Sequence, residues 1–89
     1  MVKGVTKSGF KFEVDPADAN DMEFLERLGE AMDNVAKFPK IMSELLGKDQ
    51  RDRLYDHLRN DKGKVPIDVC MNTFEEILTF VNEAGETKN

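Results

Sequence analysis

The sequence predicts a small α+β domain, mainly α, in which an N-terminal β-hairpin is followed by four helices. Apolar residues alternate with polar ones near the start of the chain, which is typical of a strand, and then recur every three or four residues, which is typical of helices. A length of 89 residues suits a single domain. We expect this domain to span residues 1–85, and residues 86–89, which carry no apolar side chain, to form a frayed tail.

The hairpin is expected within residues 1–14. Three apolar residues of its second half share one face of an extended strand: Phe10, Phe12 and Val14. Ser8-Gly9 predicts the turn. Residues 2–7 form a weaker strand because Val2 and Val5 fall on opposite faces, which leaves the register open. Two strands alone are marginally stable in water, so their apolar face has to pack on the helices.

A first helix is predicted from Asp18 or Asp21 to Asp33, after Asp15-Pro16 ends the strand. Acidic residues crowd its first turns, where the helix dipole favours negative charge. Its apolar residues recur at intervals of three or four: Met22, Leu25, Leu28, Met32 and Val35. This spacing predicts that these five residues form the buried face of the helix.

Two short helices follow. Pro39 suits the first turn of the second helix and Gly47 lies just past its end, so the two bracket four apolar residues: Ile41, Met42, Leu45 and Leu46. Asp49 is the expected cap of a third helix over Gln50–Arg59, which is mostly charged. It buries only Leu54, Tyr55 and Leu58. We therefore expect the third helix on the outside of the domain.

The fourth helix is the longest. A turn at residues 60–64 precedes it, and it is expected from Ile67 to Glu83, with Gly85 closing it. Its apolar face consists of Ile67, Cys70, Met71, Phe74, Ile77, Leu78 and Val81.

Composition limits the classes of function. The net charge of −5 argues against nucleic acid as the main partner, because DNA binding depends on neutralising phosphates. The charge is divided by segment, with +2 over residues 1–14, −6 over 15–35, +3 over 36–64 and −4 over 65–89. No apolar run is long enough for a transmembrane helix or a signal peptide, and Met1 is interpreted as a cytoplasmic start.

The residues that usually carry chemistry give no site. His57, the only histidine, has no serine or cysteine near it in the sequence, and the single cysteine, Cys70, falls on an apolar stripe. The loop around Gly63 lacks the oxygen ligands of a calcium site. We therefore expect no metal, no cofactor and no enzymatic activity.

Four apolar residues are candidates for a partner-binding surface: Phe24, Phe38, Met42 and Phe80. Phe24 and Phe80 lie roughly 80° and 110° from the centres of their helical stripes, and Phe38 lies in a connection. Phenylalanine and methionine give large, adaptable contacts. The alternative is that a thin domain buries all four against the hairpin.

In this order, the elements resemble the short tail assembly chaperones of long-tailed bacteriophages and prophages of Gram-positive bacteria, over roughly residues 8–80. The matching features are Ser8-Gly9-Phe10-Lys11-Phe12-Glu13-Val14-Asp15 before an acidic helix, Phe38-Pro39-Lys40 opening the second helix and Leu45-Leu46-Gly47 closing it. After them come Gln50, Leu54, His57-Leu58-Arg59 and a turn with Gly63, Val65 and Pro66. All of these are structural positions rather than a catalytic signature.

The resemblance implies a non-enzymatic protein of the host cell cytoplasm that is absent from the mature virion. Such chaperones bind and solubilise the tape measure protein and help to recruit the tail tube protein. A small acidic adaptor or regulatory protein that binds one partner is the alternative. Self-association into multimers is open in both cases, because a wide apolar stripe suits either internal packing or a second copy.

Overall fold

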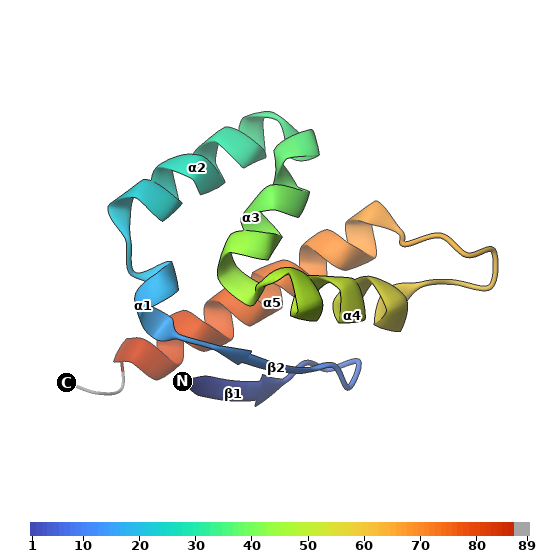
Figure 1. Ribbon diagram of the computed structural model, residues 1–89, viewed down its shortest axis with the longest axis horizontal. Coiled ribbons are helices and arrows are strands. Elements are labelled where there is room, and N and C mark those ends of the chain that lie inside the picture. The colour runs from blue at the N-terminus through green and yellow to red at the C-terminus, as the bar shows by residue number, and fades with distance from the viewer. Residues whose placement is uncertain (87–89) are drawn as a thin grey trace.

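The computed structural model describes residues 1–86 and confirms the expected fold class, a two-stranded hairpin followed by helices (Figure 1). In chain order the elements are β1 (Val2–Val5), β2 (Lys11–Val14), α1 (Pro16–Ala19), α2 (Met22–Asp33), the 3-10 helix η1 (Val35–Lys37), α3 (Phe38–Leu46), α4 (Lys48–Leu58) and α5 (Ile67–Glu86). Glu86 ends α5 rather than starting a tail, and the rest of the expected tail, residues 87–89, lies outside the described residues.

The strands are antiparallel, and their register consists of the pairs Val2 with Val14, Lys3 with Glu13, Gly4 with Phe12, and Val5 with Lys11. The predicted apolar face is confirmed, because Phe10, Phe12 and Val14 are all buried. Gly4 allows a close approach at this point: a Cβ there would lie 2.6 Å from Phe12 Cζ and 2.8 Å from Phe80 Cε1. The two phenylalanine rings meet edge to face, with centroids 5.4 Å apart.

A tight turn joins the strands where Ser8-Gly9 predicted it. The Gly9 N–H donates to Thr6 O, and the Thr6 N–H donates to Phe10 O, both at 2.9 Å. Gly9 has a φ of 94°, in the left-handed region that favours glycine. The Thr6 hydroxyl oxygen also accepts the Phe10 N–H at 3.1 Å, so the buried polar groups of the turn are satisfied.

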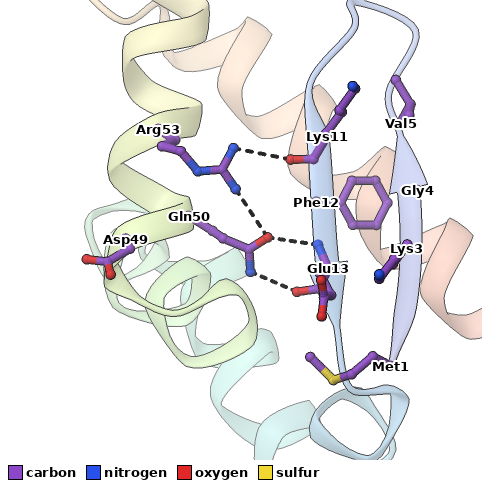
Figure 2. A pocket seen from close by; sticks show the side chains of 10 residues that line it. All are labelled: Met1, Lys3, Gly4, Val5, Lys11, Phe12, Glu13, Asp49, Gln50 and Arg53. Atoms are coloured by element: carbon purple, nitrogen blue, oxygen red, sulfur yellow. Dashed lines mark hydrogen bonds between the residues drawn. The ribbon is translucent and has the colours of Figure 1, made fainter.

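Side chains of α4 cover the outer edge of β2 (Figure 2). Gln50 Oε1 accepts the Glu13 N–H at 2.8 Å, and Gln50 Nε2 donates to Glu13 O at 2.7 Å. Arg53 donates to Lys11 O at 3.5 Å. The Gln50 amide therefore takes the two hydrogen bonds that a third strand would make with Glu13.

The helices are arranged around α5, which runs diagonally through the molecule in Figure 1. The hairpin strand β1, the short helix α1 and α4 all contact α5, whereas the main contacts of α2 are with α3. Fully buried side chains from β2, α4 and α5 meet in one core, which consists of Val14, Leu54, Phe74, Ile77 and Val81, and Ala31 of α2 belongs to the same core. α2 is thus held at one side of the domain, above α3 in Figure 1.

The helices differ from the prediction at three places. The acidic segment forms two helices instead of one: α1, capped by the Asp15 side chain, and α2, capped by Asp21, which is the later of the two expected starts. α4 begins at Lys48, because Gly47 with a φ of 82° ends α3 and starts α4 at a single residue. α5 continues through Gly85, which shows that one glycine near a helix end is tolerated.

The predicted buried face of the first helix is wrong. Phe24 and Ala31 are the buried residues of α2, and Leu28 is half-buried against the core. The other apolar residues of the predicted face are exposed: Met22, Leu25, Met32 and Val35. The helix is turned by roughly 80° relative to the expectation, because burying the Phe24 ring removes more apolar area from water than burying a methionine at the rim. Ile67, at the first position of α5, is exposed for lack of a neighbouring element.

Candidate partner-binding surface

The four predicted partner-binding residues do not share an exposed surface. Phe24, Phe38 and Met42 have only 4%, 7% and 3% of their surface exposed, and of the four only Phe80 reaches solvent, at 40%. Phe38 packs edge to face on Phe74, with centroids 6.3 Å apart. The expectation of an exposed contact surface is therefore wrong for three of the four residues. These three are core residues, because a small domain with a thin core needs its large apolar side chains to fill that core.

An exposed apolar surface does exist, and it lies on α2. We define the α2 apolar face as Met22, Leu25, Met32 and Val35, each more than half exposed. The first three are one side of α2, and Val35 begins η1 directly after it. Sequence reasoning assigned these residues to the core. The sequence held one signal of an exposed apolar side: α2 carries Phe24 and Ala31 in addition to a complete apolar stripe, so its apolar residues cover a wider arc than one buried face needs.

Polar contacts on the other side of α2 fix its rotation. Arg27 Nε donates to Glu44 Oε2 of α3 at 2.9 Å, and Arg27 also lies 3.9 Å from Asp21. The bond to Glu44 raises the pKa of the Arg27 guanidinium above its ordinary value. Lys37 Nζ pairs with Glu30 at 3.5 Å. These exposed pairs are individually weak, but together with buried Phe24 they hold the apolar face outward.

Two residues of the α2 apolar face, Met32 and Val35, line a groove between α2 and α5 with a volume of about 450 Å³. Its walls are largely apolar: Leu28, Met32, Val35, Phe38, Phe74, Met71 and Leu78, with Asn72 and Glu75 as the polar members. A second groove of about 380 Å³ lies between α3 and α5 and shares Val35, Phe38 and Met71 with the first. Exposed Ile67 lies at its rim. The two grooves are therefore adjacent.

Charge separates the two sides of α2. At 100° per residue, its exposed carboxylates fall on the side away from Leu25 and Met32: Glu23, Glu26, Glu30 and Asp33. An exposed row of apolar side chains beside two adjacent grooves, with acidic residues on the other side of the helix, is the arrangement expected of a site for another apolar element.

The structure brings His57 next to a serine that is far from it in the sequence. His57 Nε2 lies 3.1 Å from Ser8 Oγ and 3.1 Å from the Ser8 carbonyl oxygen at the tip of the hairpin. Because a carbonyl oxygen can only accept, Nε2 carries the proton when it bonds to Ser8 O, and it then has no lone pair to activate the hydroxyl. The Phe10 ring packs on His57 at 5.7 Å. The pair joins the turn to α4 and gives no nucleophile.

Among residues 1–86, no group of three His, Cys, Asp or Glu residues is placed to hold a metal ion. No described helix combines the length and the apolar character needed to cross a bilayer. Cys70 is buried, and burial raises the pKa of its thiol.

Comparison with family models, with curated proteins and with solved structures finds no match for this chain.

Proposed function

We propose that this chain is a non-enzymatic tail assembly chaperone of a long-tailed phage or prophage. It binds and solubilises the tape measure protein and helps to recruit the tail tube protein in the host cell cytoplasm, and it is not part of the mature virion. The proposal rests on the resemblance of the sequence, on the order of its elements and on one observation about the surface. That observation is the exposed apolar face of α2 beside two adjacent grooves.

The α2 apolar face suits a helical partner. An amphipathic helix presents apolar residues at three- and four-residue spacing, and a second helix with an exposed stripe beside a groove is the surface that it packs against. A long helical protein made before its enclosing tube exposes such stripes along its length. Covering them with many copies of a small acidic domain would keep it soluble.

The test is co-expression with the longest helical protein encoded in the same genome, followed by size exclusion with light scattering. The proposal predicts co-elution of many copies per partner, with the partner insoluble when made alone. Leu25→Ser with Met32→Ser should abolish co-elution, while Val5→Ser, which changes an equally exposed apolar residue on the hairpin, should preserve it. A partner that stays soluble and elutes alone would refute the proposal.

A small acidic adaptor is the second candidate. It is supported by the charge of −6 over residues 15–35, where the single basic residue, Arg27, is already paired with Glu44. A surface of one sign favours a single partner of opposite charge. A complex of one copy with one partner, weakened by salt and unchanged by the Leu25→Ser and Met32→Ser pair, would select the adaptor.

A further inference from the structure

The two edges of the hairpin differ. Thr6 and Phe10 form a hydrogen-bonded pair, and hydrogen-bonded and non-hydrogen-bonded pairs alternate along antiparallel strands. The backbone N–H and C=O groups that point away from the partner strand therefore belong to Lys3 and Val5 in β1 and to Lys11 and Glu13 in β2. On β2, Gln50 bonds both backbone groups of Glu13, and Arg53 donates to Lys11 O. On β1 the N–H and C=O groups of Lys3 and Val5 find no partner among residues 1–86.

A groove lies along α5 next to the hairpin turn. One stripe of α5 forms its floor, comprising Val69, Thr73, Glu76, Phe80 and Glu83, and Lys7 forms its other wall. Two contacts tie the hairpin to this stripe: Phe80 lies under Gly4, and Glu76 Oε2 accepts the Lys7 N–H at 2.8 Å. β1 therefore runs along α5, beside an exposed phenylalanine and a row of carboxylates.

The charges on either side of this groove are opposite. On the hairpin side the groove is lined by Lys7, and no acidic residue occurs between Met1 and Ser8. The α5 side carries Glu75, Glu76 and Glu83 and has no basic residue in the groove. A surface that places a basic residue beside an acidic strip is complementary to itself after a two-fold rotation, whereas an acidic or a basic peptide would match only one of the two charges.

We propose that the unpaired edge of β1 pairs with β1 of a second copy of this chain, in an antiparallel two-fold arrangement centred on Gly4. In this register Lys3 lies opposite Val5 of the second copy, so four backbone hydrogen bonds form and no two lysines face each other directly. The sheet then has four strands, in the order β2, β1, β1, β2.

Side chains under the sheet fit this arrangement. Gly4 of each copy meets at the axis, where the absence of a Cβ lets the strands approach and leaves room for the Phe80 ring of each copy. Because α5 runs antiparallel to β1, the rotation brings Lys7 of the second copy toward Glu83 of the first. The proposed dimer uses none of the α2 apolar face, so it stands independently of the proposed function.

The experiment is sedimentation velocity of the full chain from about 5 μM to about 1 mM, with a dimer of weak affinity expected, since small interfaces bind in that range. Val5→Pro removes one outward N–H that the hairpin itself does not use, and it should weaken dimerisation at least tenfold. Val5→Thr is the matched control that keeps the N–H and should dimerise like the unchanged chain. A wild-type chain that is monomeric throughout, or a Val5→Pro chain that dimerises equally well, overturns the proposal.

A charge reversal and an exchange measurement guard against misfolding of the proline variant. Glu83→Lys should weaken the dimer, and adding Lys7→Glu to it should restore the affinity of the unchanged chain. In the unchanged chain, amide hydrogen exchange at Lys3 and Val5 should slow as concentration rises, while exchange at Gly4 stays constant. Absence of rescue together with exchange at Lys3 and Val5 that is independent of concentration would overturn the dimer.

Discussion

The rotation of α2 is open to a direct test by two substitutions on neighbouring residues. Phe24 faces the core with 4% of its surface exposed, whereas Leu25 and Met32 are exposed to 57% and 71%. Phe24→Ala removes a buried ring and should lower the free energy of unfolding by about 3–5 kcal/mol. Leu25→Gln combined with Met32→Gln should lower it by about 1–2 kcal/mol in total, because less than half of a full burial energy of about 1.5–3 kcal/mol is involved at each position.

The difference between these two effects is large relative to the total free energy of unfolding, so an unfolding measurement can distinguish them. A domain of this length is stabilised by about 4–13 kcal/mol in total, so Phe24→Ala removes a large share of the stability. Urea unfolding followed by helical circular dichroism gives both values, provided that the slope with denaturant is unchanged. The reasoning is refuted if the glutamine pair costs more than Phe24→Ala, because that order would mean that Leu25 and Met32 are the core residues.

Three further predictions follow from local contacts. Gly4→Ala should lower the free energy of unfolding in urea by about 1–3 kcal/mol, because its Cβ would meet the ring of buried Phe12 at 2.6 Å; an unchanged midpoint would contradict this packing. The Cys70 thiol, whose pKa is raised by burial, should react with a disulfide reagent far more slowly in the native chain than in urea, and equal rates would show it to be accessible. The pKa of the Asp52 carboxyl should lie below its ordinary value of 3.8, chiefly because the carboxyl accepts a hydrogen bond from Lys48 at 2.8 Å. The ionised carboxyl therefore contributes to the stability of the folded chain above pH 3.8, and this contribution is lost as the pH falls through the lowered pKa. An NMR titration in which Lys48→Met leaves the Asp52 pKa unchanged would exclude that cause.

Elements with one strong periodic signal were predictable from the sequence. In β2 the alternation of Phe10, Phe12 and Val14 has one solution, because a shift by one residue would expose all three side chains. In α3, Pro39 and Gly47 mark the ends and leave one apolar side.

The orientation of α2 was not predictable, because its apolar residues cover a wider arc of the helix surface than the one side that packs against the rest of the domain. Which part of this arc faces the core depends on the shape of the core and on the contact of Arg27 with Glu44. Both are features of the tertiary structure that the sequence of α2 alone does not show. The pairing of Ser8 with His57 joins residues 49 apart and has no local signal at all. The candidate surface was therefore located on the wrong residues, although its residue types, methionine and a large apolar side chain, were among those expected.

The amide of Gln50 sets a limit on growth of the sheet. A hairpin with two open edges could add copies without end and become the seed of a fibre. Here one edge is sealed by a side chain that supplies a donor and an acceptor to the same residue, Glu13. Any sheet built through the other edge stops at two copies, so a cell can make this chain in quantity without risking open-ended strand addition.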